Sequence, residues 1–267
     1  MQFPIYQVNA FTDKAFGGNP AAVCPLEHWL PDEVMQNIAM QNSLAETAFF
    51  TECKVGYEIR WFTPEIEMDL CGHATLAAAH VIARHLHDPR SSLNFSSKSG
   101  LLTVTVEQNL ITLDFPSRKP VLSDVPQIIL DSFPKEPLEI LKSRDFLLVY
   151  ETEKIIREMK PNQNLLNQIN LDPGGIIVTA PGVEADFVSR FFTPQASIFE
   201  DPVTGSAHCS LIPYWSEKLS KVSLLAFQVS PRGGRLLCKD LGNRVLISGE
   251  AVTYLEGRVS IASIHEP

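Results

Sequence analysis

Short runs of aromatic and β-branched residues, separated by polar turns, recur along the chain and predict strands. Clear examples are residues 3–8 and 57–62. Residues 74–83 differ, because they are apolar on every side and consist mostly of helix formers. This pattern predicts a buried helix. A second apolar helix is predicted over residues 209–215, and we expect Pro213 to end or kink it.

The order of the predicted elements repeats once along the chain. The motif RWFTP at residues 60–64 returns as RFFTP at residues 190–194. Each copy is followed by a glycine at a helix start, Gly72 or Gly205, and then by an apolar helix. The other matched elements are strands 5–11 with 146–150, helical stretches 31–42 with 153–159 and 165–169, strands 47–50 with 176–179 and 93–95 with 225–227, and the paired strands 101–106 and 110–115 with 235–238 and 244–247. Matches in the same order favour an internal duplication over chance.

The repeat predicts an α+β fold with two pseudo-symmetric lobes. A lone apolar helix among about six strands is best buried when the sheet curls around it. We therefore expect each lobe to be a rolled mixed β-sheet, or barrel, around a central helix. The N-terminal lobe is placed at residues 1–118 and the C-terminal lobe at 119–267, joined near residues 117–126, with a last strand that can cross back. The two glycine motifs would then face each other across a cleft between the lobes, where ligands commonly bind.

The charge of the chain narrows the choice of partners. A formal net charge of −9 argues against a nucleic-acid partner and against an anionic membrane surface, since either needs a basic patch. An anionic ligand must instead be held locally, by helix starts or by a few placed cations. No apolar run approaches the length of a membrane span, and the first residues look like a strand rather than a signal peptide. We expect a cytoplasmic protein.

The cysteines and glycines point to no cofactor. The five cysteines are an odd number, widely scattered and without a C-x-x-C pair, so disulfides are not expected. Cys71 with His73, and His208 with Cys209, are conceivable metal ligands, but no other ligand pair has zinc spacing. The turn at residues 17–23 lacks the G-x-G-x-x-G pattern and the P-loop lysine, which argues against nucleotide binding. We predict neither metal nor cofactor.

Three polar residues could carry chemistry, and each has a plainer alternative. Glu46 lies among apolar residues at a predicted strand start. It is either a solvated group or a partly buried acid whose raised pKa suits it to proton transfer. Asp201 precedes a helix start at which an N-cap role for Thr204 or Ser206 is the ordinary interpretation. His73 is expected to be neutral, because the helix dipole disfavours its protonated form, and a structural role is its alternative.

Four motifs in both halves of the chain together resemble the PhzF-like family of phenazine-biosynthesis-like proteins. They are GNPAAV at residues 18–23, ETAF at 46–49, CGHAT at 71–75 and EDPVTGSA at 200–207. The resemblance implies a diaminopimelate-epimerase-like fold and a cofactor-independent isomerase. The phenazine enzyme of this family isomerises a dihydro-hydroxyanthranilate by proton transfer.

The resemblance also implies roles for individual residues. Glu46 matches the acid/base that moves the proton. The polar groups and helix-start amides around the substrate match Asn19, Gly72, His73, Asp201, Gly205 and Ser206. The implied substrate is a small, cyclic, carboxylate-bearing molecule, and the implied assembly is a homodimer. Ala45 stands where the phenazine enzyme has a serine, so one hydroxyl contact is missing.

The wider superfamily leaves two alternatives open. Its epimerases and proline racemases place a catalytic cysteine before each glycine motif. Cys71 matches the first position but Thr204 occupies the second, so a two-thiol racemase is excluded. A Cys71/Thr204 combination resembles the hydroxyproline dehydratases, lyases in which one thiol abstracts a proton. A non-catalytic binding or scaffold protein on the same fold is the other alternative.

Overall fold

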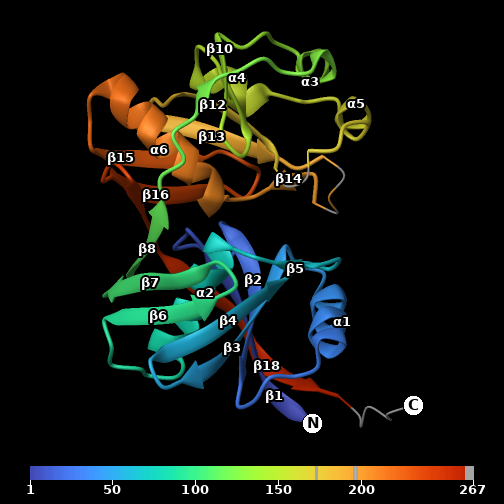
Figure 1. The fold of residues 1–267 in the computed structure, drawn as a ribbon, viewed down its shortest axis with the longest axis vertical. Helices are drawn as coiled ribbons and strands as arrows, with labels where there is room; N and C mark the ends of the chain where they lie inside the picture. The colour runs from blue at the N-terminus through green and yellow to red at the C-terminus, as the bar shows by residue number, and fades with distance from the viewer. Residues whose placement is uncertain (172–173, 195, 197, 262–267) are drawn as a thin grey trace. The chain divides into compact units, whose positions relative to one another are not determined.

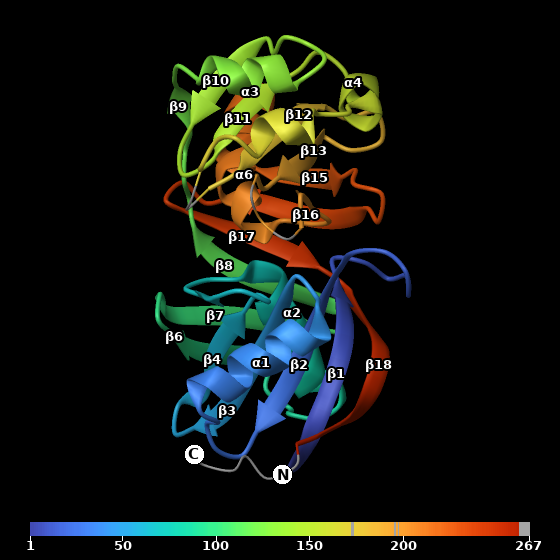
Figure 2. The same ribbon diagram turned by 90° about the vertical axis from the view of Figure 1, so that its right-hand side faces the viewer.

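Two compact units make up the chain. The structure is a computed structural model that describes residues 1–171, 174–194, 196 and 198–261. The first unit comprises Met1–Leu113 and the chain from Glu250 onward, and the second comprises Asp114–Gly249. Both are rich in strands and contain few helices (Figures 1 and 2). The boundary lies a few residues before the division expected at residue 118.

The first unit contains a mixed sheet. Its strands are β1 (Gln2–Ala10), β2 (Asn19–Leu26), β3 (Glu46–Cys53), β4 (Gly56–Phe62), β5 (Glu67–Met68), β6 (Ser92–Ser97), β7 (Gly100–Glu107), the start of β8 (Leu110–Pro116), and β18 (Ala251–Ser260). They pair in the order β18-β1-β2-β3-β4-β6-β7-β8, with β5 on the end of β4. Only β2–β3 and β4–β6 are parallel among these pairs of described strands.

The second unit repeats this topology. Its strands are β9 (Val121–Leu122), β10 (Glu139–Lys142), β11 (Phe146–Val149), β12 (Ile176–Pro181), β13 (Phe187–Phe192), β14 (Glu200–Asp201), β15 (Ser223–Gln228), β16 (Gly234–Asp240) and β17 (Arg244–Gly249). They pair in the order β9-β10-β11-β12-β13-β15-β16-β17, with β14 on the end of β13. The parallel pairs are β11–β12 and β13–β15, at the same places as in the first unit. The predicted internal repeat and the α+β class are confirmed.

One strand match made from the sequence is wrong. The segment 146–150 was matched with the first strand, at residues 5–11. In the structure β11 pairs in parallel with β12, as β2 does with β3, so β11 corresponds to β2 and β10 to β1. Strand β2 begins inside the turn signal at residues 17–20, so the sequence pattern there predicts a turn rather than a strand.

Each sheet curls around one apolar helix. The first unit's helix α2 (Gly72–Arg84) contacts β1, β2, β3, β7 and β18, which come from both ends of the sheet. The second unit's helix α6 (Gly205–Leu219) contacts β15, β16 and β17. Trp215 of α6 also stacks on Phe187 of β13, with ring centroids 5.7 Å apart, and donates a hydrogen bond to Thr179 of β12 at 3.0 Å. A central helix in each rolled sheet is confirmed.

The sequence predicts that Pro213 ends or kinks the second apolar helix. In the structure α6 does not end there but continues through Pro213. Proline has no N–H, so the carbonyl of Cys209, four residues earlier, loses its helical partner. That carbonyl accepts a hydrogen bond from the backbone N–H of Arg118 at 2.9 Å. The helix ends at Leu219, and the next residue, Ser220, adopts a left-handed conformation with φ of 52° that caps it.

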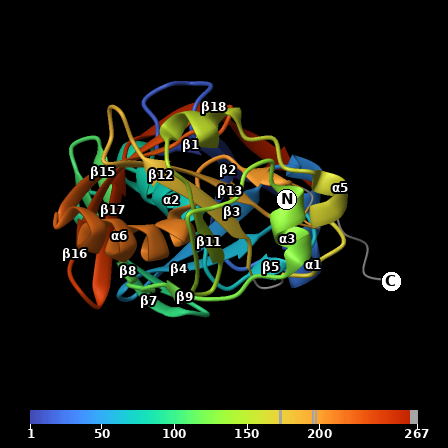
Figure 3. The same ribbon diagram turned by 90° about the horizontal axis from the view of Figure 1, so that it is seen from above.

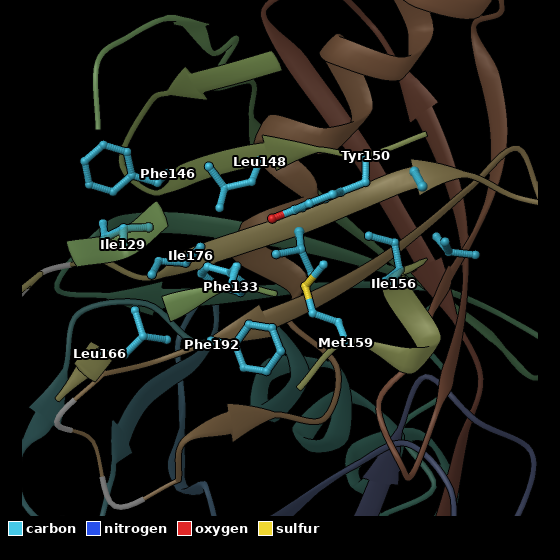
Figure 4. Packing of buried hydrophobic residues seen from close by; sticks show 13 residues of the cluster. Ile129, Phe133, Phe146, Leu148, Tyr150, Ile156, Met159, Leu166, Ile176 and Phe192 are labelled. Carbon is cyan, nitrogen blue, oxygen red and sulfur yellow. The ribbon is translucent and has the colours of Figure 1, made fainter. Parts of the chain in front are cut away.

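Shorter helices cover the outer faces of the sheets. In the first unit, α1 (Asp32–Asn42) packs on β3 and β4. In the second unit, α3 (Gln127–Ser132) and α5 (Gln163–Leu166) lie side by side (Figure 3), and α4 (Glu153–Glu158) packs on β12 and β13. Figure 4 shows the apolar cluster beneath these three helices, where Phe133, Tyr150 and Met159 are almost fully buried. None of the described helices is both long and apolar enough to cross a bilayer.

Candidate active site

An arginine–glutamate pair on neighbouring strands precedes each central helix. Arg60 of β4 donates through Nε and Nη2 to the two carboxylate oxygens of Glu67 on β5, at 2.7 and 2.8 Å. Arg190 of β13 makes the same contacts with Glu200 of β14, also at 2.7 and 2.8 Å. A two-pronged pair fixes both distance and orientation. The repeated arginine therefore holds the short strand that leads into α2 or α6.

Neither central helix is capped by a side chain among the described residues. Cys71 precedes α2 and Thr204 precedes α6, both in extended conformations with φ of −139° and −110°. The first-turn amides, which include those of Gly72 and Gly205, thus have no side-chain cap at the positive end of the helix dipole. The N-cap role considered for Thr204 is wrong, because its hydroxyl is bonded to Asp201 instead.

Glu46 and His73 lie together inside the first unit. Glu46 is the first residue of β3 and His73 the second residue of α2, and Glu46 Oε2 is 3.1 Å from His73 Nε2. Their side chains are 17% and 5% exposed, so Glu46 is not the solvated strand-end group that was its alternative. The two atoms are within ion-pair distance but are not aligned as a hydrogen bond, and the described residues offer neither atom another hydrogen bond.

Asn19 and Cys71 contact the other nitrogen of the imidazole. Because β2 runs parallel to β3, with Ala21 opposite Glu46, the start of β2 lies near His73. Asn19 Nδ2 is 3.1 Å and Cys71 Sγ is 3.6 Å from His73 Nδ1. The structure thus brings three predicted site residues together from three separate elements.

The charges of this cluster oppose the expectation of a neutral His73. Burial lowers the pKa of His73, but the Glu46 carboxylate beside the ring and the contact with Cys71 raise it by more, so the pKa lies well above its ordinary value. Burial, and then the charge of Glu46, raise the pKa of the Cys71 thiol to about 11. Cys71 is a protonated thiol at neutral pH, which makes it a poor base.

Three residues of the polar cluster carry groups that can ligate a metal. Ligand atoms of Glu46, Cys71 and His73 all lie within 4.8 Å of one another. Cys71 lies beside Nδ1 of the imidazole and Glu46 beside Nε2, and a histidine binds a metal through one of these nitrogens. The other pair considered, His208 with Cys209, is structural: His208 is fully buried and donates through Nδ1 to the carbonyl of Thr204 at 2.8 Å.

In the second unit, Asp201 belongs to a network around the loop before α6. The Thr204 hydroxyl donates a short hydrogen bond to Asp201 Oδ2. Gln228, at the end of β15, accepts from the Thr204 N–H at 2.8 Å and donates to the Asp201 carbonyl at 2.8 Å. The sequence analysis missed Gln228. Its only signal is a lone polar residue at the end of an apolar strand.

Ser206 belongs to a separate group of residues that the sequence analysis also missed. Arg144 Nη2 donates to Ser206 Oγ at 3.2 Å. Arg144 in turn pairs with Asp145, whose side chain is only 1% exposed. The second unit's predicted site residues therefore fall into two groups, with Asp201 in one and Ser206 in the other.

Comparison with known proteins identifies the family of this chain. The family model described as phenazine biosynthesis-like protein matches residues 8–257. An uncharacterized isomerase of Pseudomonas aeruginosa is 47% identical over 98% of this chain and 100% of its own length. This chain belongs to the phenazine biosynthesis-like protein family.

Solved structures show which fold this chain has. The crystal structure of a PhzF-family protein from Enterococcus faecalis matches with a TM-score of 0.93 and 45% identity, covering 98% of this chain and 100% of that one. A predicted epimerase of Pseudomonas aeruginosa, 18% identical, matches with a TM-score of 0.76 over 97% and 100% of the two chains, which shows the fold alone. The family resemblance and the epimerase-like fold drawn from the motifs are confirmed.

Proposed function

We propose that this protein is a cofactor-independent isomerase that moves a proton within a small, cyclic, carboxylate-bearing molecule. Its family membership and its relatives named as isomerases support an isomerase. The observation that carries the finer proposal is the Glu46–His73 contact of 3.1 Å between two side chains that are only 17% and 5% exposed. A carboxylate shielded from water beside an imidazole can take up and return a proton.

The proposed reaction conserves atoms and electrons. Glu46 removes a proton from one carbon of the substrate, and the electron pair of that C–H bond forms a new double bond to the neighbouring carbon. The electron pair of the existing double bond then takes the same proton back at a carbon farther along. His73, with its raised pKa, stabilises the Glu46 carboxylate before the transfer. The Asn19 side chain lies 3.1 Å from Nδ1, on the other side of the ring.

The helix starts supply the binding energy in this proposal. In the first unit, the first-turn amides at Gly72 lack a side-chain cap among the described residues and suit a carboxylate. In the second unit, the amides at Gly205 are likewise uncapped, and Asp201, fixed by Thr204 and Gln228, suits a polar substituent of a ring. These groups are proposed to bind, whereas Glu46 performs the chemistry.

Replacing Glu46 by glutamine tests this proposal. General acid–base catalysis contributes about 10²- to 10⁴-fold, so we expect Glu46→Gln to lower kcat by roughly 10³-fold while KM changes little. Glu52→Gln is the matched control, because Glu52 lies on the same strand with a 76% exposed side chain. Steady-state kinetics on a substrate found by screening cyclic carboxylates makes the comparison. Full activity of the Glu46 variant would refute the assignment.

A lyase that uses Cys71 is the second candidate. The observation in its favour is the 3.6 Å distance from Cys71 Sγ to His73 Nδ1, which would let the imidazole take the thiol proton. The burial that raises the pKa of the thiol to about 11 counts against it. We therefore prefer Glu46 as the proton carrier.

A further inference from the structure

The internal repeat places Ser143, Arg144 and Asp145 at the position of a predicted site segment of the first unit. The strand pairings give two equivalent series of facing residues, Phe62–Thr47–Ala22 in the first unit and Phe192–Ile176–Phe146 in the second. Three residues before the last member of each series lie Asn19 and Ser143. Asn19 contacts the imidazole at the start of α2, so the matching segment is placed at the start of α6.

The contacts of Arg144 agree with this placement. Its Nη2 donates to Ser206 Oγ at 3.2 Å, and Ser206 is the second residue of α6, as His73 is of α2. Ser143, the residue that matches Asn19, contacts Ser210 Oγ one turn further along α6 at 2.7 Å. The guanidinium against Ser206 comes from the next residue, Arg144.

A buried carboxylate orients the guanidinium. Asp145 accepts from Arg144 Nε and Nη2, both at 3.2 Å, and from the N–H of Gly175 at 2.9 Å. Nη2 therefore uses its two hydrogens on Asp145 and Ser206, whereas no described atom accepts a hydrogen bond from Nη1. The Arg144 side chain is 32% exposed, which leaves it open to a ligand.

We propose that Arg144 binds the carboxylate of a small-molecule ligand at the start of α6. Its Nη1, which has no acceptor among the described residues, the Ser206 hydroxyl and the uncapped amides of α6 together form donors for an anion. With a net charge of −9, the protein must hold an anionic ligand locally, by helix starts or by a placed cation such as Arg144. This inference rests on the proposed function, whose substrate carries a carboxylate.

Benzoate and benzamide form a matched pair of probes for this site, since they have the same shape and differ in charge. Isothermal titration of the full chain should show benzoate binding more tightly than benzamide. In Arg144→Gln the Kd of benzoate should rise by about 10- to 100-fold, as expected for a lost charge-assisted hydrogen bond, while the Kd of benzamide is unchanged. Arg144→Lys should keep an intermediate affinity, because it retains the charge without the fork.

Arg157→Gln is the control, because Arg157 is a 53% exposed arginine of the same unit that pairs with Glu153 on α4. It should bind benzoate as the unaltered protein does. An unchanged benzoate Kd in Arg144→Gln, or no benzoate binding by the unaltered protein at about 10 mM ligand, would overturn the proposal. Glu46→Gln should bind benzoate normally, so full turnover by that variant would remove the isomerase mechanism and leave the carboxylate site standing.

Discussion

The pKa values of two buried histidines, His73 in the first unit and His208 in the second, differ because their neighbours differ. The pKa of His73 is raised, because the Glu46 carboxylate and the contact with Cys71 outweigh the effect of burial, which lowers it. His208 is also buried but faces a backbone carbonyl, and burial lowers its pKa to about 4. The pKa values of two histidines near equivalent helix starts are therefore shifted in opposite directions.

This contrast gives a pH prediction. A histidine whose pKa is higher in the folded than in the unfolded chain stabilises the fold below the unfolded value of about 6.5, and this stabilisation is lost as pH rises through the folded pKa. NMR titration of the imidazole protons should place the midpoint of His73 above 6.5, whereas His208 should stay neutral throughout the neutral range. Between pH 6.5 and the His73 midpoint, the free energy of unfolding of the unaltered protein should fall. In His73→Asn the fall over the same range should be smaller. A His73 midpoint below 6.5 would contradict the assigned charge.

Cys71 gives a prediction that separates the two candidate functions. Because burial raises the pKa of its thiol to about 11, iodoacetamide at pH 7.5 should leave Cys71 unmodified. Cys53 is partly exposed and should react first, which makes it the internal control. Mass spectrometry of peptides after timed labelling measures both. Cys71 labelled faster than Cys53 would favour the thiol-dependent lyase.

At the scale of elements, the repeated motifs at residues 60–64 and 190–194 place the short strands that lead into the central helices. The sequence analysis recognised these motifs but not what their arginines contact, since each partner glutamate lies on a strand of only two residues. Gln228 and Arg144 were missed for a related reason. Contacts across neighbouring strands depend on register, and register is not visible in the spacing of one sequence.

The two arginine pairs should differ in strength because they differ in burial. Arg190 is 10% exposed and also donates to the carbonyls of Ile156 and Met159, whereas Arg60 is 21% exposed and also pairs with the exposed Asp32. Removing one partner of a buried pair costs about 3–5 kcal/mol, against about 0–1 kcal/mol at the surface.

We therefore expect Arg190→Met to lower the free energy of unfolding by roughly 3 kcal/mol. Arg60→Met should lower it by about 1 kcal/mol. Urea unfolding followed by circular dichroism compares the two variants directly. Equal losses would show that burial does not distinguish the two copies of the motif.

At the scale of the whole molecule, the duplicated topology was predictable because matched motifs recur in the same order in both halves. The prediction failed for strand 5–11, because strand β2 follows a strong turn signal and its partner β11 has only four residues. The motifs also predicted that Asn19, Glu46 and His73 belong to one site, but they did not predict the charge of His73. That charge depends on distances between side chains from three elements, which only the folded chain supplies.

The central claim is that one residue, Glu46, carries the migrating proton. With a substrate deuterated at the carbon that loses its proton, mass spectrometry of the product tests this most directly. The unaltered protein and Glu52→Gln should transfer deuterium to the second carbon, with a primary isotope effect on the rate. Glu46→Gln should form no detectable labelled product over the same time. Transfer of the label by Glu46→Gln at the rate of the unaltered protein would contradict the account.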